Sequence, residues 1–250
     1  MKILYTCTYS AGISGVWNRV YNVAKEMMKR GHEVYVFSSN LESGTLKEMP
    51  SEEIVEGIKI FRFGVKKFGS KNAYLYNGGK LKAKLKEMMP DVVDCQTYRH
   101  SEGNIISAGA VKLGIPCFLT THAPFMSVSI RGKWLSLLSF MYDLLIGKRV
   151  LRRFKKVIAI SKWEYPYLNK LGVKDERISY VPNGIPSEFF RDKRFMSDKV
   201  RKILFFGRIA PVKDVETLLK AWSLIERGHK YLYLEIVGPA ETEYMKKLEN

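Results

Sequence analysis

The chain has 250 residues, of which 46% are hydrophobic and 27% are charged. This is the composition of an ordinary globular protein, and it excludes a disordered, collagenous or disulfide-stapled chain. The charge is unusual, because 42 Lys and Arg residues against 25 Asp and Glu residues give a net charge of +17. So positive a surface attracts anions, and the candidate partners are nucleotides, nucleic acids and acidic lipids.

The three cysteines predict neither a metal site nor a disulfide framework. Cys7, Cys95 and Cys117 are widely spaced and form no Cys-x-x-Cys pair. Such cysteines usually behave as small buried hydrophobic residues. We therefore expect three buried thiols, a reducing compartment and no bound metal.

The sequence predicts a cytoplasmic location. The first apolar run is too short for the hydrophobic region of a secretory signal. The longest apolar stretch, 134–146, falls well short of the about 20 residues that span a bilayer. We expect neither a signal peptide nor a membrane-spanning helix.

Short β-type runs alternate with helical patterns through the first 181 residues. This alternation is typical of a parallel, doubly wound sheet in which helices form the crossovers. The predicted strands are 2–7, 34–38, 54–55, 58–63, 91–95, 116–120, 157–160 and 178–181. The predicted helices are 16–27, 74–89, 102–113, 133–154 and 162–171.

A second pattern of the same kind follows a polar stretch with little periodicity. We expect a domain over 1–186, a linker over 187–199 and the start of a second domain over 200–250. The second domain would contain strands and helices at 203–206, 215–226, 231–237 and from 241 onwards. One strand-helix-strand unit is too small for a complete doubly wound sheet. The sequence therefore predicts that the chain stops inside its second domain.

The loop after the first predicted strand contains Gly12 and Gly15 in the run SAGISG. Glycines at this point let the backbone approach a ligand, and the free N–H groups of a helix start bind phosphate. The run is not GxGxxG, and the second predicted strand ends in FSSN without an acid. NAD binding is therefore disfavoured. Taken alone, the loop is explained equally well as a tight turn.

Arg208 and Lys213 lie between a predicted strand and a predicted helix, in the run GRIAPVK. An Arg fork and a Lys point charge can converge on one anion there, assisted by the helix dipole. Isolated loop cations are usually only solvated. Their position at the carboxyl end of a parallel strand favours anion binding.

Six runs in fixed order resemble one enzyme family. They are GISGVWNRVYNVAKEMMKRGHEVYVFS, PDVVDCQ, VIAISKWEYPYL, ISYVPNGIPSEFF, ILFFGRIAPVKDVETLLKAW and LEIVG. Each run is modest alone, but the ordered set covers nearly all of 1–240. It resembles the family 4 retaining glycosyltransferases of the GT-B fold. The resemblance implies an α/β structure with an acceptor-side Rossmann-like domain, a doubly wound parallel sheet, followed by the start of a second Rossmann-like domain that binds the donor.

The resemblance also implies a donor and the residues that bind it. The donor would be a nucleoside-diphosphate sugar such as a UDP- or GDP-sugar, with no metal and no separate cofactor. Arg208 and Lys213 would hold the diphosphate and neutralise the departing nucleotide. Gly12 and Gly15 would bring backbone amides to the same phosphates, and Gly238 of the run LEIVG would line the donor site.

His122, in the run TTH, matches a family histidine close to the transferred sugar. A lone histidine is more often structural, but the resemblance favours a catalytic role in positioning the sugar. Tyr98, Arg99 and His100 follow another strand and are expected to line the acceptor side. The family usually has Lys-Gly where this sequence has Lys213 followed by Asp214. We expect Asp214 to cap the next helix. The family's paired glutamates would lie beyond residue 250.

Two basic clusters remain outside these motifs. The first lies between 62 and 86 and contains no acid: Arg62, Lys66, Lys67, Lys71, Lys80, Lys82, Lys84 and Lys86. The second follows the apolar stretch 134–146: Lys148, Arg149, Arg152, Arg153, Lys155 and Lys156. A basic, apolar helix of this kind can lie on an anionic membrane. A core-facing helix with a solvated basic end is the alternative.

The leading hypothesis is therefore a retaining glycosyltransferase that glycosylates a glycolipid, a polysaccharide or another acceptor. A peripheral contact of 148–156 with the cytoplasmic face of a membrane is a second expectation. No nucleic-acid-binding motif accompanies the charge, so we expect no nucleic-acid partner. The alternatives are an NAD-dependent enzyme that modifies sugar nucleotides and a truncated or degenerate relative that binds nucleotide or membrane without turnover.

Overall fold

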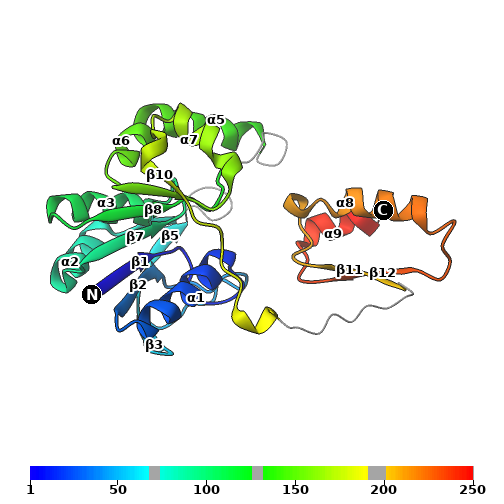
Figure 1. The fold of residues 1–250 in the computed structure, drawn as a ribbon, viewed down its shortest axis with the longest axis horizontal. Coiled ribbons are helices and arrows are strands. Elements are labelled where there is room, and N and C mark those ends of the chain that lie inside the picture. Colours follow the sequence, from blue (N-terminus) through cyan, green and yellow to red (C-terminus); the bar gives the residue numbers. More distant parts are fainter. Residues whose placement is uncertain (68–73, 126–131, 191–200, 250) are drawn as a thin grey trace. The chain divides into compact units, whose positions relative to one another are not determined.

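The computed structural model describes residues 1–67, 74–125, 132–190 and 201–249. They form two compact units, Met1–Ser187 and Glu188–Asn250, shown in Figure 1. Most of the predicted linker 187–199, and Lys71 of the first basic cluster, lie outside the described residues.

An eight-stranded sheet forms the centre of the first unit, in the order β10-β9-β8-β7-β1-β2-β4-β3. Neighbouring strands are parallel except β3 and β4, which are antiparallel. The strands are β1 (Lys2–Thr6), β2 (Glu33–Ser39), β3 (Glu52–Val55), β4 (Ile58–Phe63), β7 (Val92–Gln96), β8 (Cys117–Thr120), β9 (Lys156–Ala159) and β10 (Ile178–Tyr180). The chain winds one way from β1 to β2 and the other way from β7 onwards. The switch point of this doubly wound sheet therefore lies between β1 and β7, where ligands bind in such folds.

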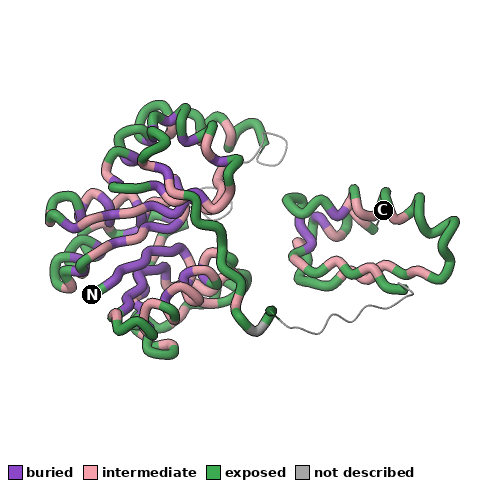
Figure 2. The backbone as a smooth tube through the Cα atoms, in the orientation of Figure 1, coloured by how far each residue is buried: buried purple, intermediate pink, exposed green. Residues whose placement is uncertain are grey.

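The two faces of this sheet carry separate cores, because side chains alternate along each strand. Ile3 and Tyr5 of β1 pack with Trp17 on one side, and Leu4 packs with Leu81 on the other. The central strands β1, β2 and β7 are mostly purple in Figure 2, because most of their residues are buried. The covering helices are α1 (Gly15–Lys29), α2 (Gly78–Met88), α3 (Ser101–Lys112), α6 (Lys148–Leu151) and α7 (Tyr165–Lys170). The helix α5 (Lys133–Tyr142) precedes α6 and buries none of its residues. Short 3₁₀ segments are η2 (Lys162–Glu164), η3 (Asp175–Arg177) and η4 (Ser187–Phe189).

The predicted helix 74–89 is wrong in its first turn. Tyr74–Tyr76 is a strand, β6, that pairs antiparallel with β5 (Val65–Lys67). Tyr74 and Tyr76 are buried while Leu75 between them is exposed, which is strand alternation. The helix begins only after Asn77, whose side-chain oxygen accepts the backbone N–H of Lys80 at 3.1 Å. An Asn cap fixes this start.

The predicted helix 133–154 is continuous only as far as Leu151, and its middle is a π turn. That turn, η1 (Asp143–Gly147), joins α5 to α6. Single π turns inside helices are rare and occur frequently at functional sites.

The second unit is one strand-helix-strand-helix arrangement. Strands β11 (Lys202–Phe206) and β12 (Tyr233–Val237) are parallel. They are joined through a 3₁₀ turn, η5 (Pro211–Lys213), and α8 (Val215–Ile225), and α9 (Thr242–Glu249) follows. Its small core contains Ile209, Val215 and Tyr244.

The three cysteines are free and buried, as the sequence predicted. No helix within the described ranges has both the length and the apolar character needed to cross a membrane.

Candidate functional site

Strained backbone marks the carboxyl ends of β7 and β8, beside the switch point. Thr97 and Arg99 follow β7 with φ of 69° and 73°, and His122 and Ala123 follow β8 with φ of 55° and 51°. None is a glycine, so each left-handed conformation costs energy. Residues of this kind cluster at functional sites, which makes this edge the candidate site of the first unit.

His122 is held here as a neutral imidazole. Its Nε2 lies 2.8 Å from Oε1 of the buried Gln96, and the same oxygen accepts a hydrogen bond from Arg19 at 3.3 Å. Because Arg19 can only donate, Gln96 presents its oxygen, and Nε2 of His122 carries the proton. Burial, helped by the charges of Arg19 and His100, lowers the pKa of His122 to about 3. Its Nδ1 therefore keeps a lone pair that can accept a hydrogen bond from a hydroxyl group.

Asp94 lies on the same face of β7 as Gln96, two residues earlier. Thr120 donates its hydroxyl to both carboxylate oxygens, at 3.1 and 3.2 Å. Burial raises the pKa of Asp94 to about 6, although Arg19 and the hydrogen bonds from Gln96 and Thr120 oppose this. Asp94 and Gln96 were not predicted as site residues from the sequence. Their signal was two polar residues inside the otherwise apolar strand VVDCQ.

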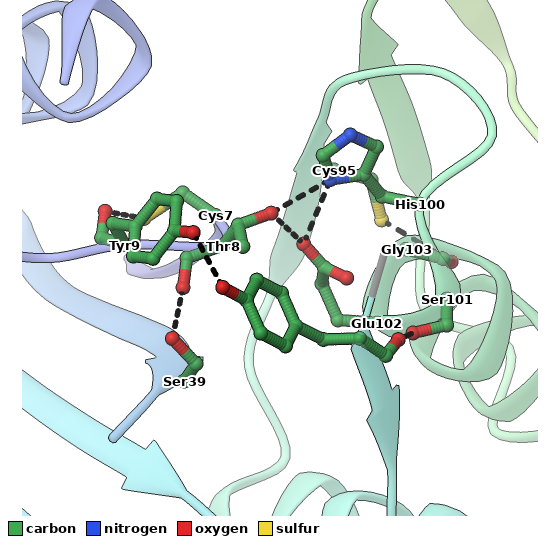
Figure 3. Close-up of polar contacts among 10 residues, drawn as sticks. Cys7, Thr8, Tyr9, Ser39, Cys95, His100, Ser101, Glu102 and Gly103 are labelled. Carbon is green, nitrogen blue, oxygen red and sulfur yellow. Dashed lines mark hydrogen bonds and ion pairs between the residues drawn. The ribbon is translucent and has the colours of Figure 1, made fainter. Parts of the chain in front are cut away.

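A second polar cluster joins the end of β1 to the start of α3 (Figure 3). The hydroxyl of Thr8 donates a hydrogen bond to the carboxylate of Glu102 at 2.8 Å. The same hydroxyl oxygen accepts a hydrogen bond from Nδ1–H of His100 at 2.6 Å. Burial by itself would raise the pKa of Glu102. The hydrogen bonds from His100 and Thr8 more than offset it, and the pKa lies below its usual value. Nearby, the hydroxyls of Tyr9 and Tyr74 form a hydrogen bond of 2.9 Å.

Gly12 and Gly15 stand in different environments. Gly12 has φ +75°, and a Cβ there would lie 2.3 Å from the carbonyl oxygen of Ser43. Internal packing alone therefore requires this glycine. Gly15 is the first residue of α1, and a Cβ there would have no neighbour within 4 Å. The preceding residue, Ser14, caps the helix by accepting a hydrogen bond from the backbone N–H of Trp17 at 3.3 Å. The N–H group of Gly15 has no acceptor among the described residues and is free for an anion.

Buried Glu164 holds the chain on both sides of His122. Its carboxylate accepts the hydroxyl of Thr121 and the backbone N–H of Ala123, the latter at 3.1 Å. It also accepts the backbone N–H groups of Ile160 and Ser161, at 2.9 and 3.0 Å. The run SKWE is a capping-box pattern that our sequence analysis did not single out.

In the second unit, Arg208 and Lys213 lie on a loop with a fixed backbone. Ile209 and Ala210 between them are buried, and the N–H of Ile209 donates to the carbonyl of Pro239 at 2.8 Å. Both cations are exposed, and neither pairs with a carboxylate in the described part of the chain. The loop thus presents two positive charges without internal partners.

Gly238 is explained by packing between the ends of β11 and β12. A Cβ at this position would lie 1.9 Å from the carbonyl oxygen of Gly207. Asp214 occupies the expected cap position of α8, but the expected side-chain cap is wrong. Asp214 stands at the cap position with φ 51°, but its side chain makes no capping hydrogen bond. The position requires a left-handed backbone, which glycine adopts freely and Asp tolerates.

Two other expected surface residues, Tyr98 and Arg62, lie inside the fold, and Arg99 is partly buried. Tyr98 is buried, and it donates its hydroxyl to Asp143 at 3.0 Å. Arg99 pairs with the same carboxylate at 2.6 Å, so neither residue is free to line an acceptor. Arg62 of the first basic cluster is also buried, and it pairs with Glu53 at 2.6 Å.

Comparison with known proteins agrees with this geometry. A model of Glycosyltransferase Family 4 matches residues 13–189. An uncharacterized glycosyltransferase of Methanocaldococcus jannaschii is 24% identical over 98% of this chain and 65% of its own length. Crystalline HepE of Anabaena in complex with UDP-glucose has a TM-score of 0.67 at 17% identity, over 100% of this chain and 64% of HepE. A trehalose-6-phosphate protein of E. coli, bound with UDP-2-fluoro glucose, has a TM-score of 0.70 at 13% identity, over 100% and 69%.

Two Rossmann-like units of this kind define the GT-B class of glycosyltransferase fold. Because the family model covers more than half of the residues, the chain belongs to Glycosyltransferase Family 4. It spans 65% of the length of the curated relative.

Proposed function

We propose that the protein transfers a sugar from a nucleoside-diphosphate donor to an acceptor, with retention of configuration and without a bound metal. One observation carries the proposal: Arg208 and Lys213 are exposed at the carboxyl end of β11, on a loop fixed by buried neighbours, and neither pairs with a carboxylate among the described residues. A rigid loop with two free cations suits an anion that changes charge during a reaction.

In this proposal the loop stabilises the leaving group. When the sugar departs, negative charge develops on the nucleoside diphosphate. Arg208 offers a bidentate fork to the phosphate oxygens, and Lys213 offers a compact positive charge. Gly238 lets β12 approach this loop closely. Within the first unit, the N–H of Gly15 at the start of α1 would be a separate donor to phosphate. Gly12 keeps the loop before α1 against Ser43.

His122 would position the transferred sugar. Its imidazole is neutral and its Nε2–H is already donated to Gln96. The lone pair on Nδ1 can then accept a sugar hydroxyl. A group with a pKa of about 3 is a poor general acid near neutral pH, so positioning fits His122 better than proton transfer.

We favour a UDP-sugar over a GDP-sugar as the donor. HepE and the E. coli protein were solved with UDP-glucose and UDP-2-fluoro glucose. The acceptor would be a glycan or a lipid-linked molecule, reached in the cytoplasm or at the cytoplasmic face of a membrane.

The test measures the Tm of the full-length protein with UDP, GDP, ADP or NAD, each at low and at high salt. A ligand at about 100 times its Kd stabilises the fold by roughly 2.7 kcal/mol. We expect UDP to raise Tm in both salts. Changing Arg208→Ala together with Lys213→Ala should abolish the shift and the hydrolysis or transfer of UDP-sugar.

A matched control is Arg227→Ala with Lys230→Ala, two exposed cations elsewhere in the second unit. This variant should respond to UDP like the wild type. A response to NAD alone, or an unchanged UDP shift in the Arg208 and Lys213 variant, would refute the assignment. A UDP shift without sugar transfer would instead favour a degenerate relative that binds nucleotide without turnover.

A further inference from the structure

The helix formed by α5 and η1 exposes most of its large apolar side chains to solvent. All of α5 is described, and none of its residues is buried. Trp134 is 69% exposed, Phe140 64% and Leu145 59%. The green tube over this segment in Figure 2 shows the same exposure, at the place labelled α5 in Figure 1. The large exposed apolar residues are Trp134, Leu135, Leu137, Leu138, Phe140, Met141, Leu144, Leu145 and Ile146.

This helix is attached to the protein through its polar and small residues, the reverse of an ordinary surface helix. Asp143 accepts hydrogen bonds from Arg99 at 2.9 and 2.6 Å. The hydroxyl of Tyr142 donates to Asn104 at 3.0 Å. Gly147 is buried, and a Cβ there would lie 2.1 Å from the hydroxyl of Tyr98. The π turn directs these groups inward, which leaves the apolar side facing away from the protein.

The length of this segment excludes a membrane span. α5 and η1 have ten and five residues, which gives about 22 Å of helix. The hydrocarbon core of a bilayer is about 30 Å thick. A helix too short to cross a bilayer and too apolar for water fits the interface between lipid and water.

Positive charge follows directly after this apolar surface. Lys148 and Arg149 of α6 are exposed, as are Arg152, Lys155 and Lys156 beyond it. Asp143 is the one acid between 133 and 156, and its charge is already neutralised by Arg99. Apolar side chains next to exposed cations match acyl chains next to anionic headgroups. A second copy of the chain would instead place like charges together.

We propose that α5 and η1 lie in the interface of an anionic membrane, with the basic residues of 148–156 at its headgroups. Arg99 joins η1 to the end of β7, beside His122 and His100. A lipid-linked acceptor would therefore arrive at the candidate site from this side, a consequence that rests on the proposed function. Binding to the membrane itself does not depend on sugar transfer.

The test is co-sedimentation of the full-length protein with vesicles, without donor. Phosphatidylcholine vesicles are compared with vesicles that also contain phosphatidylglycerol. Changing Leu138→Glu with Leu145→Glu should weaken binding to the anionic vesicles by more than roughly tenfold, because it removes apolar burial and adds repulsion. The matched control is Leu75→Glu with Val111→Glu, two exposed apolar residues of the first unit away from α5.

Charge is tested in the same way. Lys148→Glu with Arg149→Glu should weaken binding to anionic vesicles and reduce its dependence on salt. Lys82→Glu with Lys86→Glu, exposed on α2, changes the net charge equally and should bind as the wild type does.

Each result has a definite meaning. Wild-type protein that stays in the supernatant with both kinds of vesicle overturns the proposal, and so does equal binding by the Leu138 and Leu145 variant. If the wild type does not bind lipid but elutes on gel filtration as a larger species than the Leu138 and Leu145 variant, the surface is an interface between two copies of the chain. Loss of vesicle binding with an intact UDP-induced Tm shift would leave the proposed function untouched.

Discussion

Glu164 and Ala123 are joined by a hydrogen bond of 3.1 Å between the carboxylate and the backbone N–H that follows His122. The same carboxylate also binds the side chain of Thr121, immediately before His122. One buried acid therefore fixes the backbone on both sides of a histidine with φ 55°. The strain at His122 is stable because Glu164 holds it there.

Glu164→Gln should destabilise the first unit. All four donors meet carboxylate oxygens, so the amide of Gln would face at least one backbone N–H with its own NH₂ group. Leaving a buried donor unpaired costs about 1–3 kcal/mol. Urea unfolding should show a loss of that size.

The positioning role of Glu164 has its own readout. The ring resonances of His122 should shift in the Gln variant, while those of His229 in the second unit stay in place. Unchanged unfolding and an unchanged His122 spectrum would show that the carboxylate does not hold this turn.

Asp94→Asn should stabilise the protein at alkaline pH. The pKa of Asp94 is raised to about 6 from 3.8, so the folded state disfavours the charged carboxylate. Its contribution is present below pH 3.8 and is lost as the pH rises through 6. Asn keeps an acceptor for Thr120 and carries no charge.

Unfolding measured at about pH 4 and about pH 8 checks this. The variant and wild type should agree near pH 4 and differ by roughly 3 kcal/mol near pH 8, in favour of Asn. A variant that is less stable at both pH values would mean that attraction to Arg19 outweighs the burial of Asp94.

His122 should stay neutral over the working pH range of the protein. Its folded pKa, about 3, lies below the ordinary value of 6.5. Its contribution to stability is therefore present above pH 6.5 and is lost as the pH falls toward 3. In NMR titration the ring of His122 should not change protonation between about pH 8 and pH 5. A midpoint near 6.5 would contradict the neutral Gln96 pairing.

The sequence allowed the sheet to be predicted because buried parallel strands are continuous apolar runs between crossover helices. The strand Tyr74–Tyr76 was not predicted, because three alternating residues next to a helix also fit a helical pattern. Gly12 and Gly15 were predicted as a pair, yet Gly12 meets the backbone of Ser43, which lies far away in sequence. The π turn depends on Arg99 and Tyr98, and spacing within the helix does not reveal such partners.

Gly12 and Gly15 should differ sharply when each is changed to Ala. Gly12→Ala places a Cβ 2.3 Å from a backbone oxygen at φ +75°, so a loss of about 2 kcal/mol or more is expected. Gly15→Ala meets nothing within 4 Å at the start of α1 and should leave stability unchanged or raise it slightly. Thermal unfolding of the pair checks this, and equal losses would contradict the contact with Ser43.

Asp214→Gly should stabilise the second unit. Asp214 has φ 51° and ψ 50°, and its side chain does not cap α8. Glycine adopts this left-handed conformation without the cost of a Cβ, which is worth about 1 kcal/mol. No capping hydrogen bond is lost in exchange. Tm of the variant should therefore rise.

Asp214→Ala separates backbone strain from loss of the carboxylate. Ala removes the same charge but keeps the Cβ, so it should be less stable than the Gly variant. Equal stability of the two would show that the charge of Asp214, next to Lys213, decides the effect. A Gly variant that is less stable than wild type would show that the side chain does stabilise the start of α8.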